Sequence, residues 1–127
     1  MKKFYVASSL NNKAMVRDVS QRLIEKGYLQ TYDWTKNSNV TSLEALAEIG
    51  RLEREAVLEA DFVLVLLPAG KGSHIEFGLA LAHDKRVYLY SPDDAINNVK
   101  ATTTFYHLPQ VTKCIGTIDE LIVAVVG

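Results

Sequence analysis

The sequence predicts a single α/β domain in which helices cover both faces of a parallel sheet. Residues 62–67 form a continuous apolar run, which is typical of a strand covered on both faces. Other short apolar runs alternate with segments of helical periodicity, and this alternation implies right-handed crossovers between parallel strands. The 127 residues are enough for one domain, 1–127, with its own core.

Composition narrows the range of functions. Hydrophobic residues make up 48% of the chain, charged residues 23%, and the net charge is -1. Because no cluster of Lys and Arg is present to displace counterions, we do not expect binding to a nucleic-acid polymer. No apolar run approaches the length of a membrane span, and residues 1–7 turn polar too soon for a signal sequence. We therefore expect no contact with a membrane.

The few cysteine and histidine residues argue against a metal centre. Cys114 is the single cysteine and cannot form a disulfide within the chain, which favours a reducing, cytoplasmic setting. His74, His83 and His107 show no metal-ligand spacing with Cys114. Because the chain also lacks a dinucleotide fingerprint, we expect neither a metal nor a cofactor.

Two strands and a helix are predicted in the first 34 residues. Residues 4–7 form a short apolar strand, and residues 8–12 a polar turn. Residues 29–34 form a second strand, weaker because polar side chains are mixed with aromatic ones. The helix between them ends at Gly27, which suits a C′ position. Its apolar residues recur at helical spacing: Met15, Val16, Val19, Leu23 and Ile24.

A longer helix follows the polar loop at residues 36–40. Thr41-x-x-Glu44 matches a capping box at its start. One face of this helix is apolar and comprises Leu46, Ile49, Gly50, Ala56, Val57 and Ala60. Glu53 lies in the centre of that face. An isolated buried carboxylate is costly, so Glu53 must be paired, protonated or open to a cavity. The simplest form of pairing would be a salt bridge to an Arg or Lys at the edge of the core.

The central strand ends in a glycine-rich turn. Pro68 cannot donate to the ladder, and Gly70 and Gly72 permit a sharp turn or the close approach of a ligand. Ser73 is predicted as the N-cap of a helix that runs to about residue 83. The predicted inner stripe of this helix is Ile75, Leu79 and Ala82.

The remaining elements complete a flavodoxin-like (Rossmann-like) three-layer sandwich. We expect a strand over residues 86–90, a long polar loop over 93–109, a strand over 111–115 and a helix over 118–126. The last helix starts with the capping box Thr117-x-x-Glu120. The preferred order of the five parallel strands is 2-1-3-4-5.

Candidate site residues gather where the strands of such a sheet end. Ligands bind in the crevice at the carboxyl ends of the strands, and Glu76 would lie at its rim. Ser8 and Ser9 would face the same crevice, or they serve only the turn. Ser73-x-x-Glu76 is itself a capping-box pattern, so in the alternative interpretation Glu76 only caps its helix.

Two acids in one crevice indicate a particular chemistry. Glu53, on the buried face of the preceding helix, could approach Glu76. Paired carboxylates can cleave a glycosidic bond, one attacking the anomeric carbon while the other handles protons. Two close acids also push each other's pKa apart, which suits that division of roles. The turn Gly70-Lys71-Gly72-Ser73 could in addition hold a phosphate at a helix N-terminus.

Two stretches resemble the nucleoside 2-deoxyribosyltransferase family. They are an Ala-Asp pair with an apolar strand at residues 60–68, and a Gly-x-x-x-Glu-x-Gly core at residues 72–78. With Tyr5-Val6-Ala7-Ser8-Ser9 the resemblance covers most of residues 4–90. It implies that Glu76 is the nucleophile and that the acid eight residues before Asp61, which is Glu53, assists. Well-studied members carry Asp at that second position, so the Glu53 carboxylate is displaced by about one C–C bond.

The resemblance also bears on substrate and partners. Relatives that hydrolyse deoxynucleoside monophosphates place Ser six residues before the nucleophile and Arg shortly after the first strand. Gly70 and Asn11 stand there in this chain, which argues against tight 5′-phosphate recognition. Family sites are completed by a neighbouring subunit, so a homo-oligomer is expected, a dimer or higher, with residues 91–106 as the candidate contributing segment.

The expected activity is therefore a retaining transfer of 2-deoxyribose. Glu76 attacks C1′ of a 2′-deoxynucleoside, a second base or water resolves the deoxyribosyl-enzyme, and Glu53 protonates the departing base or orders the site. The expected substrate pocket comprises Tyr5, Ser8, Ser9, Gly70, Gly72, Ser73 and His74. The alternatives are a non-catalytic nucleotide or nucleoside sensor on the same scaffold and an N-glycosidase acting on another ribosyl compound.

Overall fold

The chain forms a five-stranded, all-parallel sheet with the order β2-β1-β3-β4-β5, as predicted. The structure is a computed structural model that describes residues 2–127. The strands are β1 (Lys3–Ser8), β2 (Leu29–Gln30), β3 (Phe62–Leu66), β4 (Arg86–Ser91) and β5 (Val111–Ile115). Strand β3 lies at the centre and all five of its residues are buried, which is why its sequence is apolar throughout.

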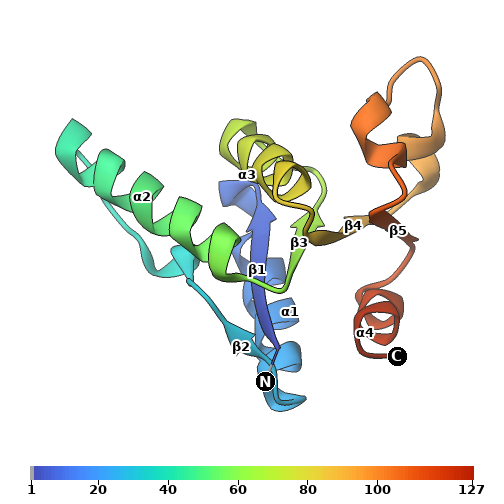
Figure 1. Cartoon of the computed structure of the whole chain (residues 1–127), viewed down its shortest axis with the longest axis horizontal. Helices are drawn as coiled ribbons and strands as arrows, with labels where there is room; N and C mark the ends of the chain where they lie inside the picture. Colours follow the sequence, from blue (N-terminus) through green and yellow to red (C-terminus); the bar gives the residue numbers. More distant parts are fainter. Residues whose placement is uncertain (1) are drawn as a thin grey trace.

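Four helices cover the sheet in two layers, as Figure 1 shows. They are α1 (Lys13–Glu25), α2 (Leu43–Glu59), α3 (Lys71–Ala82) and α4 (Ile118–Val126). Helices α1 and α4 contact each other on one face, and α2 and α3 contact each other on the opposite face. Four short 3-10 helices lie in the connections, at Leu10–Asn12, Trp34–Lys36, Asp94–Asn97 and Thr104–His107. The three-layer α/β sandwich is thus confirmed.

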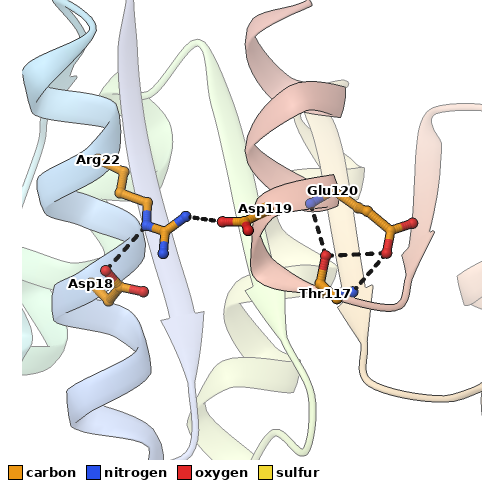
Figure 2. Close-up of polar contacts among 5 residues, drawn as sticks. All are labelled: Asp18, Arg22, Thr117, Asp119 and Glu120. Atoms are coloured by element: carbon orange, nitrogen blue, oxygen red, sulfur yellow. Dashed lines mark hydrogen bonds and ion pairs between the residues drawn. The ribbon is translucent and has the colours of Figure 1, made fainter.

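Figure 2 shows the polar contacts that join α1 to α4 and that cap the start of α4. Arg22 on α1 donates to Asp18 over 3.2 Å and also to Asp119 on α4. The predicted capping box of α4 is present, because the Thr117 hydroxyl accepts from the Glu120 amide and the Glu120 carboxylate accepts from the Thr117 amide, both over 3.2 Å. These exposed ion pairs each add little stability, so the layer depends mainly on the buried faces of both helices.

The predicted second strand was too long. Only residues 29–30 pair as a strand, and one further bond, from the Thr31 amide to the Phe4 carbonyl, extends the ladder. The chain then turns into the 3-10 helix Trp34–Lys36, and the Trp34 indole donates to the Val6 carbonyl over 2.7 Å. This side chain takes the carbonyl that a longer strand would have used, and the strand therefore ends early.

The predicted inner face of α2 was only half right. Ala56, Val57 and Ala60 are buried, but Leu46 is 53% exposed and Gly50 is also exposed. The helix is longer than the part of the sheet beneath it, and Figure 1 shows its first turns projecting beyond β1. Its N-cap is Ser42, whose hydroxyl accepts from the Ala45 amide, and not Thr41.

Helix α3 also differs from the prediction at its start and on its buried face. The N-cap is Gly70, and Ser73 is the third helical residue, whose hydroxyl accepts from the Gly70 amide over 2.7 Å. The buried residues of α3 are Ser73, Phe77 and Ala80, whereas Ile75 is 73% exposed. Because α3 is apolar nearly all round, its periodicity did not identify the inner face. No helix within residues 2–127 has the length and apolarity needed to cross a membrane.

Candidate active site

A cavity of about 490 Å³ opens at the carboxyl ends of β1 and β3. The strand order changes direction between β1 and β3, and the crevice at such a switch point is the usual ligand position in these folds. The loop after β1, the loop after β3 with the start of α3, and one side chain each from α2 and the segment after β2 form its walls. Its lining residues are Ser8, Ser9, Leu10, Asn11, Trp34, Glu53, Gly70, Lys71, Gly72, Ser73 and Glu76.

Glu76 is held in this cavity by a tyrosine. It is the sixth residue of α3, and its Oε2 accepts a hydrogen bond of 2.6 Å from the Tyr5 hydroxyl. Tyr5 is fully buried in β1, so the residues packed around it hold the donor in place. The bond occupies Oε2 and leaves Oε1 for another contact. The alternative in which Glu76 caps α3 does not apply, because the capping position is filled by Ser73 bonding to Gly70.

Glu53 reaches the same cavity from α2. It is partly buried and takes part in none of the ion pairs found among residues 2–127. The salt bridge to an Arg or Lys that the sequence left open is therefore not formed within that part of the chain. Instead, the carboxyl group of Glu53 lies close enough to Glu76 and Tyr5 to interact with both. The cavity thus brings together two carboxyl groups, and the buried Tyr5 hydroxyl lies behind one of them.

The environment raises the pKa of both acids. Burial raises the pKa of Glu76 to about 8, the hydrogen bond from Tyr5 acts in the opposite direction, and the neighbouring Glu53 raises it further. Burial also raises the pKa of Glu53, while its contacts with Glu76 and Tyr5 lower it. Burial and the two acids raise the pKa of Tyr5, so its hydroxyl remains a donor. At neutral pH the two carboxyl groups together retain about one proton.

Ser8 and Ser9 border the cavity, but hydrogen bonds to the loop after β1 and to β3 already engage their side chains. The Ser8 hydroxyl donates to the Leu66 carbonyl over 2.7 Å and accepts from the Asn12 amide group over 3.0 Å. The Ser9 hydroxyl accepts from the Asn11 backbone amide over 3.3 Å. Both serines therefore shape the loop after β1, and each keeps only part of its hydrogen-bonding capacity for a ligand.

The opposite wall is the glycine edge, which we define as residues 70–73. A side chain added at Gly70 or Gly72 would meet no atom within 4 Å, so the space beside both glycines is open. The Ser73 hydroxyl is fully engaged, because it accepts from the Gly70 amide and donates to the Gly70 carbonyl. Its contribution to the cavity is therefore to fix the edge.

His74 does not join the other predicted site residues. Its ring lies on the other side of α3, where it borders two further cavities. Both ring nitrogens are engaged, Nδ1 with the Gly70 carbonyl at 2.9 Å and Nε2 with the Tyr106 hydroxyl at 2.7 Å. The sequence placed His74 in the substrate pocket because it is adjacent to Ser73, but successive residues of a helix point in different directions.

Four lining residues were absent from the predicted site: Leu10, Asn11, Trp34 and Lys71. Leu10 and Asn11 could have been found, because they follow β1 at the same edge of the sheet as Ser8 and Ser9. Trp34 gave no such signal, since its position depends on the early end of β2. A second cavity of about 440 Å³ shares Leu10, Trp34 and Glu53 with the first. The two spaces are thus contiguous, with Glu53 between them.

This arrangement suits acid–base and nucleophilic chemistry on a small molecule. One carboxyl group is fixed by a buried donor, the second is adjacent to it, and a proton is shared between them. Within residues 2–127 there is no group of three His, Cys, Asp or Glu side chains with the arrangement of a metal site.

Comparison with known proteins finds a solved structure with a similar fold. No protein-family model matches the sequence, and no curated protein matches it. The solved structure of the Clostridium botulinum CMP N-glycosidase BcmB is similar to it, with a TM-score of 0.67 and 19% sequence identity, over 98% of this chain and 98% of that chain. At this identity the likeness concerns the fold alone.

Proposed function

We propose that this protein cleaves the N-glycosidic bond of a 2′-deoxynucleoside and transfers the 2-deoxyribose to another nucleobase or to water. The observation that supports this most is the meeting of Glu53 and Glu76 in one cavity, with Glu76 held by the buried Tyr5 hydroxyl. A pair of carboxyl groups that forms no ion pair within residues 2–127 suits a reaction whose transition state develops positive charge on the sugar. The likeness in fold to a CMP N-glycosidase agrees with this class of reaction.

In the first step, Glu76 attacks C1′ while the bond from C1′ to the base nitrogen breaks. Because Tyr5 occupies Oε2 of Glu76, the attacking atom is Oε1. The proton that the two acids share is on Glu53 in this step and passes to the departing base, so Glu76 attacks as the carboxylate and Glu53 is left ionised. The products are a neutral base and a deoxyribosyl ester of Glu76.

In the second step, a base or a water molecule attacks C1′ from the face that the first base left. The ester bond to Glu76 breaks, and Glu53 accepts the proton that the attacking group loses. Two displacements at C1′ retain its configuration. The second cavity, which has Trp34 and Glu53 in its wall, offers space for a planar base beside the proton donor.

The experiment is intact mass spectrometry after incubation with a 2′-deoxynucleoside. We expect a deoxyribosyl adduct on the wild-type protein and none on Glu76→Ala or Glu76→Gln. Addition of a different free base should remove the adduct and yield a new nucleoside. If the wild type forms neither an adduct nor free base from any of the common 2′-deoxynucleosides, deoxyribosyl transfer is ruled out.

The second candidate is hydrolysis of a ribosyl nucleotide. Lys71, which belongs to the glycine edge and lines the cavity, provides a cation that could meet a phosphate. Comparison of CMP, cytidine and 2′-deoxycytidine in the same assay separates the two candidates. Release of cytosine from CMP alone would favour hydrolysis, and the Lys71→Gln variant should then lose most of this activity. A nucleotide sensor would bind these compounds and release no base from any of them.

A further inference from the structure

Two of the four residues of the glycine edge are glycines. Gly70 and Gly72 have no side chains, and no atom lies where a side chain would be. Glycine loses more conformational freedom on ordering than any other residue, so such an edge needs support from elsewhere. Three hydrogen bonds meet at the Gly70 carbonyl, from the His74 amide over 3.1 Å, the Ser73 hydroxyl over 3.0 Å and the His74 ring over 2.9 Å.

The His74 ring links this carbonyl to a distant part of the chain. A carbonyl can only accept, so the His74 nitrogen beside Gly70, Nδ1, carries a proton. In the neutral ring Nε2 is then an acceptor, and it receives the Tyr106 hydroxyl over 2.7 Å. Burial raises the pKa of Tyr106, which keeps this hydroxyl protonated. The two hydrogen bonds thus run in one direction, from Tyr106 through His74 to Gly70.

Tyr106 is itself firmly placed. It is 8% exposed, its ring lies parallel to the His74 ring with centroids 6.1 Å apart, and it meets the Phe77 ring edge-on at 5.7 Å. Its 3-10 helix, Thr104–His107, is attached to β5 by a contact of 2.9 Å between the Lys113 ammonium and the His107 ring. The long connection after β4 therefore presents a fixed hydroxyl to the start of α3.

We infer that Tyr106, acting through His74, is a positioning residue that holds the glycine edge in place for substrate binding. The role in substrate binding rests on the proposed function. That Tyr106 holds the glycine edge in place can be tested without any turnover of substrate. The edge lines the cavity, whereas the carboxyl group of Glu76 is held separately by Tyr5. Loss of the support should therefore weaken substrate binding more than it slows the chemical step.

The test compares Tyr106→Phe, which removes one hydroxyl and keeps the ring, with Tyr90→Phe. Tyr90 donates to the Gly116 carbonyl over 2.8 Å and lies outside the cavity, so it controls for the loss of one tyrosine hydrogen bond. We expect Tyr106→Phe to raise KM about fivefold with kcat changed less than about twofold, and Tyr90→Phe to change neither. His74→Asn should match Tyr106→Phe, and the double variant should be no worse than either single variant.

Hydrogen exchange supplies the readout that needs no substrate. The Gly70 and His74 amides are bonded within the edge, and Tyr106→Phe should make their exchange about tenfold faster without affecting β3. If Tyr106→Phe only lowers the melting temperature, as Tyr90→Phe does, with KM and both amides unchanged, the inference is wrong. If the wild type turns over no nucleoside or nucleotide, the proposed function fails, and the two amides still decide whether Tyr106 positions the edge.

Discussion

Replacement of Glu76 by Gln should stabilise the protein, and more so at neutral than at acidic pH. Burial raises the pKa of this carboxyl from 4.5 to about 8 in the folded state. The folded state therefore holds the proton more tightly than the unfolded state does, and wild-type stability falls as pH rises between these two values. Glutamine has a similar size and can still accept from Tyr5, but it carries no ionisation cost.

The size of the effect follows from the two pKa values. At about 1.4 kcal/mol for each pH unit, ionisation of Glu76 costs the folded state about 1 kcal/mol at pH 5 and about 3 kcal/mol at pH 7. The stability advantage of Glu76→Gln over the wild type should thus be about 2 kcal/mol larger at pH 7 than at pH 5.

Urea unfolding at pH 5 and pH 7 measures this gain directly. The control is Glu25→Gln, which removes an exposed carboxyl group at the end of α1 and should change stability by less than about 0.5 kcal/mol. If the advantage of Glu76→Gln were the same at both pH values, Glu76 would not be perturbed by burial. The shared proton in the proposed mechanism would then have no basis.

Three further predictions concern other parts of the molecule. Tyr5→Phe removes a bond that lowers the pKa of Glu76, so the acidic limb of the pH–rate profile should move to higher pH and kcat should fall at least about tenfold. Trp34→Phe leaves the Val6 carbonyl without its indole donor and should cost about 1–3 kcal/mol in urea unfolding, whereas an unchanged midpoint would mean that water replaces the bond. Ile75 is 73% exposed on α3, so we expect the wild type to be a dimer or larger in light scattering and Ile75→Glu to be a monomer; a wild-type monomer would contradict this prediction.

The order of the strands and the placement of Glu53 and Glu76 at one cavity could be predicted from the sequence because they depend on local signals. The apolar run of β3 shows that it is covered on both faces, and the glycine turn with its following helix shows where the chain leaves the sheet. Glu53 could be singled out because it interrupts an apolar face.

Other features depend on contacts between distant residues and could not be predicted. The bond from Tyr5 to Glu76 joins residues 71 positions apart, and the bond from Tyr106 to His74 joins residues 32 apart. Thr41 and Ser42 are adjacent hydroxyl residues of similar capping preference, so local chemistry did not decide between them. Leu46 lies on the apolar face of α2 but beyond the end of the sheet. Periodicity shows which face of a helix is apolar, but it does not show how far the sheet extends beneath that face.

The shortness of β2 also affects how the protein behaves when crowded. An edge strand offers unpaired amide and carbonyl groups to other chains, and long, flat edges promote aggregation. Here one edge has only two residues and is followed by a turn, while the other edge, β5, has the exposed Lys113 at its centre. Neither edge is a good template for the addition of a foreign strand, so fibril-like stacking of folded molecules is disfavoured.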